Sequence, residues 1–424
     1  MEAGPGLGVA FVFAAGLVLW GLGSARLTQW NVTAPLAFVA WGVVMVGVLG
    51  VSHVEADSSA VREIAEFALA LVLFSDAARV NVHSLRRDAG VPGRLLGIGL
   101  PLTIGLGIAA ALLCFTSVDP WVAAIIGAAL APTDAALGAT VVEDERVPGR
   151  IRRALNVESG LNDGLVTPVV TFFIVGAIEA TQAVVHEHAG QAAVDLAAGV
   201  LVGALVGVVG GWLLSRERRS GWASESFVPV AILGLAIVAF AGAKELGVNG
   251  FVAAFVGGLA FGAVNRDSPE RAEGSMAFVA LGGELLSLLL WFLFGTFLLD
   301  VLDAAPTGIV IYAVLSLTVV RMVPVALASI GSGLHASTVA FMGWFGPRGL
   351  ASVVFALIAF DDLGQRGDGE VVLGAIAATV LASVVLHGIT AGPLVARYSR
   401  RAGALADDRP ELVTVPEIPT RRLG

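Results

Sequence analysis

Apolar residues fill most of this chain in runs of about 20, and short polar segments separate the runs. A helix of about 20 residues spans the hydrocarbon core of a bilayer, which is about 30 Å thick. The pattern therefore predicts an all-α polytopic membrane protein. We expect about thirteen spans, at residues 6–24, 33–52, 62–78, 94–117, 121–142, 154–178, 192–214, 226–243, 248–264, 276–299, 307–330, 336–360 and 371–393.

The composition agrees with this pattern. Apolar residues make up 57% of the 424 residues and charged residues 14%, whereas about a quarter of the residues of a soluble domain are charged. The net charge of −9 does not favour a nucleic-acid partner. Because Cys114 is the single cysteine, the chain has neither a disulfide framework nor a cysteine metal site. The expected environment is the lipid bilayer of the cell membrane.

The cations indicate the orientation. Segments that follow odd-numbered spans, together with the C-terminal segment, hold 20 of the 25 lysines and arginines, and the opposite side holds three. Because cations concentrate in cytoplasmic loops, the N-terminus is predicted outside and the C-terminus in the cytoplasm. Residues 1–398 form the predicted transmembrane domain, in which core and dimerisation parts interleave. Residues 399–424 are polar and aperiodic, and we expect a short mobile cytoplasmic tail there.

A few ionisable side chains remain within or close to the predicted spans. Such groups are costly in a membrane, and by default they mark an ion or substrate pathway. Three of them, Asp76, Asp300 and Arg321, lie near predicted span ends, where they could equally reach the interface. Glu284 lies deeper but could be a structural partner of a neighbouring helix. The other four are Asp134, Glu158, Asp163 and Arg348.

The segment ALAPTDAALGA, residues 129–139, predicts a broken helix in span 5. Pro132 lacks an amide hydrogen, and its ring clashes with the preceding turn. Irregular backbone at membrane depth is tolerated where it lines a cavity or is buried in protein. The break offers carbonyl oxygens, and Thr133 and Asp134 add side-chain oxygens suited to a hard cation.

The segment ESGLND, residues 158–163, places four polar side chains on one apolar helix. Residues four apart lie on one helix face, so Ser159 and Asp163 share one stripe, and Glu158 and Asn162 share the adjacent stripe. The first stripe can direct oxygens at an ion. Glu158 needs a cation to remain ionised in low dielectric, and we predict that Arg348 is its partner.

The element GPRG, residues 346–349, predicts a second broken helix, in span 12, because Pro347 interrupts it. This break follows the first one by seven spans. Breaks at matching positions of two halves indicate an inverted-repeat transporter with its site near the midplane.

The motifs PTD, ESGLNDG and GPRG, in this order over thirteen predicted spans, resemble those of the monovalent cation:proton antiporter superfamily, in its NhaP-like sodium/proton exchanger branch. The resemblance implies an inverted-repeat antiporter fold and a homodimer. It implies a transporter, not an enzyme, that has no cofactor besides the transported sodium and proton.

The resemblance also assigns roles to residues. Asp163 would be the carboxylate that carries the cation and the proton in turn. Sodium would lie at Asp163, Ser159 and Thr133, with the backbone near Asp134 completing the shell. Glu158, Asn162 and Arg348 would form a bracing cluster. Some relatives have a glutamate after the phenylalanine of span 3; this chain has Ser75 there and Asp76 next to it, so Asp76 is a further candidate ligand.

A lone buried carboxylate fits exchange on chemical grounds, because desolvation favours its protonated form and a cation can replace the proton. An Asn-Asp pair such as Asn162 and Asp163 is associated in the family with electroneutral exchange, so one cation per proton is expected. A potassium/proton antiporter, or another ion-coupled transporter of this fold, is the alternative function. An intramembrane hydrolase is a remote alternative, since no G-x-S-x-G nucleophile motif occurs.

Overall fold

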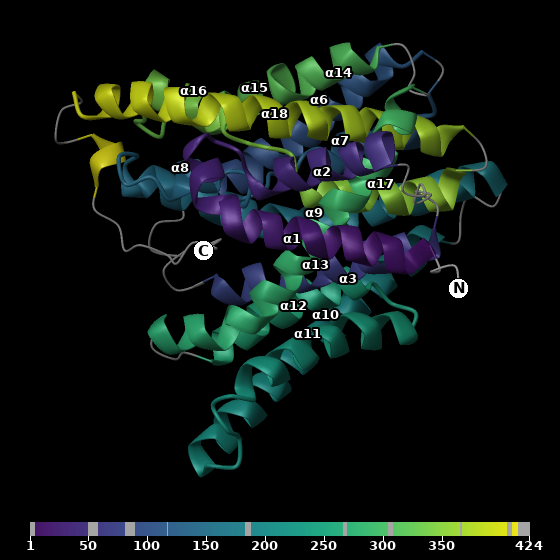
Figure 1. The fold of residues 1–424 in the computed structure, drawn as a ribbon, viewed down its shortest axis with the longest axis vertical. Coiled ribbons are helices and arrows are strands. Elements are labelled where there is room, and N and C mark those ends of the chain that lie inside the picture. Colours follow the sequence, from purple (N-terminus) through teal and green to yellow (C-terminus); the bar gives the residue numbers. More distant parts are fainter. Residues whose placement is uncertain are drawn as a thin grey trace.

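The computed structural model describes residues 5–49, 58–80, 90–116, 118–182, 188–265, 269–303, 308–364, 367–404 and 409–413. Within these ranges every regular element is a helix. Figure 1 shows long helices that run roughly side by side, with the α10–α11 hairpin projecting from one end of the molecule. The predicted all-helical class is confirmed.

Several helices are continuous over their whole length. They are α1 (Pro5–Gln29), α2 (Ala34–Leu49), α3 (Ser59–Arg79), α9 (Gly149–Gln182), α10 (His188–Ser220), α11 (Val228–Glu245), α12 (Gly250–Val264), α13 (Pro269–Asp303) and α18 (Asp368–Ala402).

The remaining helices are shorter and follow one another with interruptions. They are α5 (Gly90–Arg94), the π-helix η1 (Leu95–Gly99), α6 (Leu100–Cys114), α7 (Pro120–Ala129), α8 (Ala139–Val142), α14 (Ile309–Leu317), α15 (Val319–Ala328), α16 (Ala336–Trp344), α17 (Leu350–Leu363) and the short 3-10 helix η3 (Pro410–Leu412).

The helices match the predicted spans in position. Among the described residues, eight helical stretches are both long and apolar enough to cross a membrane, and the shorter helices 34–47, 120–129 and 250–264 are apolar as well. The chain is therefore a multi-pass membrane protein. The count of thirteen crossings stays a prediction.

Both predicted helix breaks are present. Regular helix is interrupted between Ala129 and Ala139, around Pro132, and again between Trp344 and Leu350, around Pro347. A third interruption, at Thr318, separates α14 from α15 and was not predicted.

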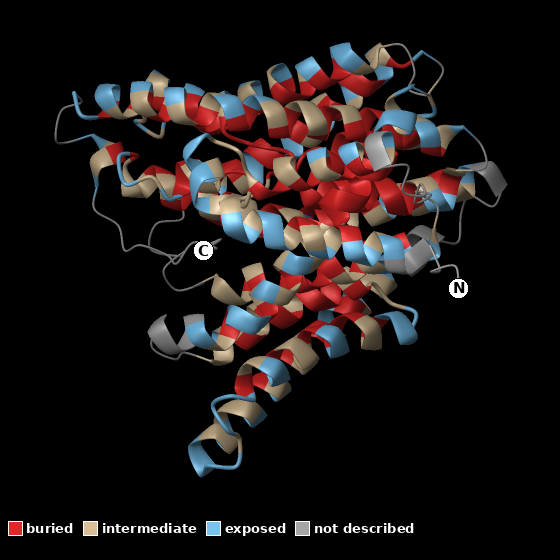
Figure 2. Ribbon diagram, in the orientation of Figure 1, coloured by how far each residue is buried: buried red, intermediate tan, exposed pale blue. Residues whose placement is uncertain are grey.

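Two groups of helices make most of the contacts. Helices α2, α3, α10, α11, α12 and α13 pack on one another, whereas α6, α7, α9, α14, α15, α16, α17 and α18 form a second group. The groups meet where α3 contacts α9 and α17, where α13 contacts α17 and α18, and where α12 contacts α9. Figure 2 shows buried residues concentrated in the middle of the molecule, where α9 and α17 lie in Figure 1.

Small residues bring α10 and α12 close together. Gly203 and Gly207 lie one turn apart on α10, and a Cβ on either would overlap backbone atoms of α12. Close backbone approach through small residues is a common way to associate helices in a membrane, where the hydrophobic effect between helices is weak. This contact makes α10 and α12 a tightly packed part of the first group.

Part of the segment expected to be a mobile tail lies within the described residues. Helix α18 continues to Ala402, and residues 409–413 lie against α9 and the start of α16. The Glu411 side chain is buried, and its Oε1 accepts hydrogen bonds from His335 N–H (2.5 Å) and the Thr338 hydroxyl (3.0 Å). Arg150 donates to the Pro410 carbonyl at 2.8 Å. Residues 405–408 and 414–424 lie outside the described ranges.

Candidate functional site

The two broken helices meet in the second group of helices. The backbone N–H of Asp134, in the first break, donates to the carbonyl of Pro347, in the second, at 2.8 Å. Neither group has a helical partner at these positions, so each break satisfies backbone atoms that the other leaves open. The interrupted backbone is thus buried in protein, as irregular structure at membrane depth requires.

Asp134 caps the half-helix that follows the second break. Its Oδ2 accepts the N–H of Leu350, the first residue of α17, at 3.1 Å, and its Oδ1 accepts the N–H of Ala136 at 2.7 Å. A carboxylate at a helix N-terminus is favoured by the open N–H groups and by the helix dipole. Gly349 makes this approach possible, because a Cβ there would overlap the Asp134 carboxylate. The predicted ion ligand Asp134 therefore has a structural task in this arrangement.

Arg348 binds the end of the helix that precedes the first break. It is fully buried, and its Nη1 donates to the carbonyls of Ala131 (2.6 Å) and Pro132 (3.2 Å) beyond the end of α7. Its Nη2 donates to the Ser316 carbonyl at 3.4 Å. A cation near the open carbonyls of a helix C-terminus is stabilised in the same way as an anion at the N-terminus.

The predicted Glu158–Arg348 ion pair is wrong. Glu158 pairs instead with Arg321 of α15, with Nη1–Oε1 at 2.5 Å and Nη2–Oε2 at 2.9 Å. The side chains are 4% and 3% exposed, so Arg321 does not reach toward an interface, as its sequence position allowed. The physical reason is that the open carbonyls of the first break occupy Arg348, which leaves Arg321 to neutralise Glu158.

The structure brings the predicted ligands Thr133 and Ser159 together. Their hydroxyl oxygens are 2.9 Å apart, between the first break and α9. Asn162 Nδ2 donates to Thr133 Oγ1 at 2.8 Å, which leaves the Thr133 proton for Ser159. Asn162 is almost completely buried. Its amide hydrogen bond therefore goes to a predicted ligand and not to the Glu158 ion pair.

A cavity beside these residues collects the remaining predicted acids. Residues of both helix groups line it: α9 contributes Ser159 and Asp163, the first break contributes Asp134, α3 contributes Asp76, and α13 contributes Glu284. Ser287 and Trp291, one and two turns after Glu284 on α13, complete the polar and aromatic part of the lining. Asp76 and Glu284 thus line the same cavity as Asp163.

Carboxylate and hydroxyl oxygens around a water-sized space form a donor set suited to a hard cation. No cysteine and no histidine lines the cavity. Asp163 and Ser159 share one stripe of α9, as the four-residue spacing predicts. The arrangement offers oxygen ligands for one small cation.

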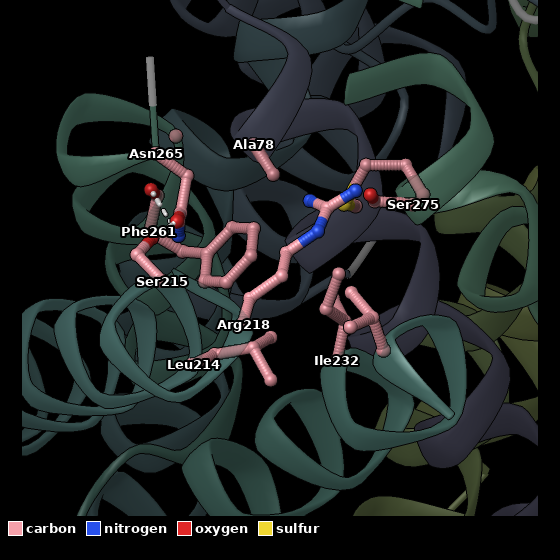
Figure 3. Close-up of a pocket in the computed structure, with 11 residues that line it drawn as sticks. Ala78, Leu214, Ser215, Arg218, Ile232, Phe261, Asn265 and Ser275 are labelled. Carbon is pink, nitrogen blue, oxygen red and sulfur yellow. Dashed lines mark hydrogen bonds between the residues drawn. The ribbon is translucent and has the colours of Figure 1, made fainter. Parts of the chain in front are cut away.

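A second pocket lies elsewhere and has a different character. Figure 3 shows Arg218 reaching into a pocket between apolar side chains of α10, α11 and α12, with Ser215 and Asn265 hydrogen-bonded at one side. Arg218 forms an ion pair with Glu225, with Nε–Oε1 at 2.8 Å. None of the predicted site residues lines this pocket, and a guanidinium inside it disfavours a cation there.

Two polar residues at the second break were not predicted. Ser383 and His387 of α18 are buried and contact the backbone on either side of Pro347. A signal existed for one of them: His387 is the histidine that falls inside a predicted span, 371–393, and an ionisable residue in a span is a functional candidate by default.

Comparisons with known proteins identify the family. The sequence profile of the family described as "Sodium/hydrogen exchanger, transmembrane" matches residues 8–397. The chain is 26% identical over 313 residues to the K(+)/H(+) antiporter NhaP2 of Shewanella oneidensis, covering 71% of this chain and 52% of that protein. It is 27% identical over 259 residues to the probable Na(+)/H(+) antiporter C3A11.09 of Schizosaccharomyces pombe, covering 56% of this chain and 33% of that protein. The chain thus spans about half the length, or less, of these curated relatives.

The fold is similar to that of a solved antiporter. The sodium proton antiporter MjNhaP1 of Methanocaldococcus jannaschii superposes with a TM-score of 0.75 at 19% identity, covering 93% of this chain and 99% of that one. At this identity the likeness shows the fold, and the predicted antiporter fold is confirmed. Together with the family match over nearly the whole membrane domain, it shows that the chain belongs to the sodium/hydrogen exchanger family.

Proposed function

We propose that the protein exchanges one sodium ion for one proton by alternating access, with Asp163 as the shared carrier. The single observation that carries the proposal is the cavity in which Asp163 and Ser159 meet the first helix break. In this scheme the cation lies at Asp163, Ser159 and Thr133. Desolvation makes a charged carboxylate without a cation costly, so Asp163 is occupied by either a proton or a cation when it crosses.

The cavity lies where the two helix groups meet, which suits alternating access. Helices α3 and α13 line one side, and α9, the first break and α17 line the other. Motion of the second group against the first would expose Asp163 to one side of the membrane at a time. Asp76 and Glu284, on the static side of such a motion, would attract the cation into the cavity.

Electroneutrality follows from the neutral neighbour of the carrier. Asn162 is a neutral amide that donates to Thr133 and does not bind or release a proton during exchange. Exchange of one cation for one proton at one carboxylate moves no net charge. Potassium is the second candidate cation, because one of the relatives reported above is a K(+)/H(+) antiporter.

The assembly and orientation belong to the same proposal. We place the protein in the cell membrane as a homodimer, with the N-terminus outside and the C-terminus in the cytoplasm, as the distribution of cations predicts. Accessibility of single introduced cysteines in a Cys114→Ala background, probed from each side of sealed vesicles, tests the orientation. Cross-linking between differently tagged copies tests the dimer.

The function is tested in proteoliposomes that contain the purified protein and a preset pH gradient. Addition of sodium, potassium or lithium should dissipate the gradient, and dequenching of a pH-sensitive dye reports the flux. Sodium is expected to give the lowest KM. No response to any alkali cation would contradict cation/proton exchange. A response to potassium alone would show that potassium, and not sodium, is the substrate.

A further inference from the structure

The second helix break is held from α18 by Ser383 and His387, which lie one turn apart on that helix. The N–H of Arg348 donates to Ser383 Oγ at 2.7 Å. His387 Nε2 lies 2.8 Å from the carbonyl oxygen of Trp344. Both side chains are buried, with exposed fractions of 0% and 3%. They therefore contact the last residue of α16 and the residue that follows Pro347, at the two ends of the irregular segment.

Both ring nitrogens of His387 face carbonyl oxygens, which only accept hydrogen bonds. Nε2 lies 2.8 Å from the Trp344 carbonyl, Nδ1 lies 2.8 Å from the Ser383 carbonyl, and Ser383 Oγ lies 3.1 Å from Nδ1. Either nitrogen can carry the proton of the neutral ring, and the ring protonated at Nε2 donates to Trp344. Ser383 Oγ accepts the N–H of Arg348. Ser383 and His387 thus contact each other and both ends of the irregular segment.

These contacts are connected to the ion site through the backbone of the second break. Pro347 accepts the N–H of Asp134, and the Arg348 guanidinium binds the carbonyls of Ala131 and Pro132. Thr133 lies between these anchored residues, and its hydroxyl contacts Ser159 at 2.9 Å. A shift of the second break would therefore move Thr133 relative to α9.

We propose that Ser383 and His387 are positioning residues, which fix the second helix break so that Thr133 stays in place as a ligand of the ion site. The assignment rests on the proposed cation/proton exchange. Neither residue touches the cavity. Ser383 supplies the acceptor for the Arg348 N–H, and an unpaired buried backbone N–H is costly. His387 adds a second donor to the Trp344 carbonyl, which also accepts the N–H of Gly346 at 2.8 Å, and so holds the end of α16 from α18.

Simple packing is the competing explanation for His387, because its ring also lies 5.2 Å from the Trp344 ring and 6.4 Å from the Phe345 ring. The two explanations differ in what a substitution must preserve. Phenylalanine keeps an aromatic ring but has no donor. Glutamine loses the ring but places an amide N–H near the position of Nε2.

The test measures sodium KM, maximal rate and detergent melting temperature for reconstituted full-length variants. For His387→Phe and Ser383→Ala we expect sodium KM to rise about fivefold or more, with maximal rate changed less than about threefold, since a ligand is displaced but the carrier remains. His387→Gln should stay within about twofold of wild-type KM. The sodium KM of the double variant should be no higher than that of the single variant with the higher KM, because both residues hold the same helix break.

Thr379→Val is the matched control. Thr379 lies one turn before Ser383 on α18, is fully buried, and donates to the Ala375 carbonyl of its own helix. Its loss should leave sodium KM unchanged. An unchanged KM in Ser383→Ala, an equal rise in Thr379→Val, or His387→Phe closer to wild type than His387→Gln would each overturn the proposal. Ser383→Ala decides alone if His387→Phe does not fold. If the wild-type protein shows no cation-driven proton flux at all, the proposed function fails and the positioning role fails with it.

Discussion

Glu158 of α9 and Arg321 of α15 face each other as a bidentate ion pair inside the protein, with N–O distances of 2.5 and 2.9 Å. The pair ties the helix that carries Asp163 to the helix that follows the Thr318 interruption. It also keeps Arg348 available for the carbonyls of the first break. Arg321 thus neutralises the buried Glu158 carboxylate, and Arg348 binds the open carbonyls that follow α7.

Removing one member of this pair should destabilise the protein. Arg321→Ala leaves Glu158 charged and uncompensated in a buried site, which costs about 3–5 kcal/mol. The double variant Glu158→Gln with Arg321→Gln should lose less stability than Arg321→Ala, because no isolated charge remains. Melting of the purified variants in detergent, followed by loss of monodisperse protein, measures the difference.

The pairing itself has its own control. Glu158→Gln combined with Arg348→Gln should lose more stability than Glu158→Gln combined with Arg321→Gln, since Glu158 is hydrogen-bonded to Arg321 and the Arg348 guanidinium binds backbone carbonyls. If Glu158→Gln with Arg348→Gln lost less stability than Glu158→Gln with Arg321→Gln, Arg348 would be the partner of Glu158.

Gly349 is predicted to be intolerant of a side chain. A Cβ at this position overlaps the Asp134 carboxylate that caps α17. Gly349→Ala must move one of the two broken helices, at a cost of roughly 1–3 kcal/mol, and transport should fall with it. Gly234→Ala on α11 is the control, because a Cβ there meets nothing within 4 Å. Equal melting temperatures and fluxes for the two variants would show that the two broken helices can move apart without loss of stability or transport.

Ser159→Ala should weaken cation binding and spare the transport cycle. The variant loses one neutral ligand and the hydroxyl contact with Thr133, worth about 1 kcal/mol, whereas Asp163 remains. Sodium KM is expected to rise about fivefold with nearly unchanged maximal rate. Steady-state exchange over a range of sodium concentrations measures both. A large drop in maximal rate at unchanged KM would indicate that Ser159 acts in the conformational change instead.

Exchange should be indifferent to membrane potential. One cation against one proton at a single carboxylate moves no net charge, whereas each unbalanced charge would add about 2.3 kcal/mol of driving force per 100 mV. Flux in proteoliposomes clamped with potassium and valinomycin, with sodium as substrate, should be the same at both signs of the potential. A rate or an end point that follows the potential would exclude one-for-one exchange.

Much of the architecture could be predicted from local rules. Pro132 and Pro347 coincide with the two breaks, as the missing N–H and the ring clash of proline favour, although Pro168, Pro324 and Pro393 lie inside continuous helices. The four-residue spacing of Ser159 and Asp163 fixes their common face. The choice between Arg321 and Arg348 as the partner of Glu158 could not be predicted. The break at Pro132 predicts open carbonyls, but which arginine reaches those of residues 131 and 132 depends on how the helices pack.

The contacts of residues 409–413 could not be predicted for a related reason. The segment 399–424 is polar and aperiodic as a whole, and its composition is typical of a mobile tail. The position of residues 409–413 follows from the open N–H at the start of α16, which Glu411 accepts, and from the partner that Arg150 finds in the Pro410 carbonyl. Such tertiary acceptors become visible when the helix ends are placed in space.

The most direct test of the whole account is cation-driven proton flux in liposomes that contain folded Asp163→Asn protein. The amide is nearly isosteric and keeps hydrogen-bonding capacity, but it can neither release a proton nor balance the charge of a cation. We predict that flux disappears for sodium, potassium and lithium alike, while the protein stays folded and its melting temperature remains close to that of the wild type. Flux near the wild-type level in this variant would contradict the account, and would move the carrier to another acid of the same cavity, Asp134, Asp76 or Glu284.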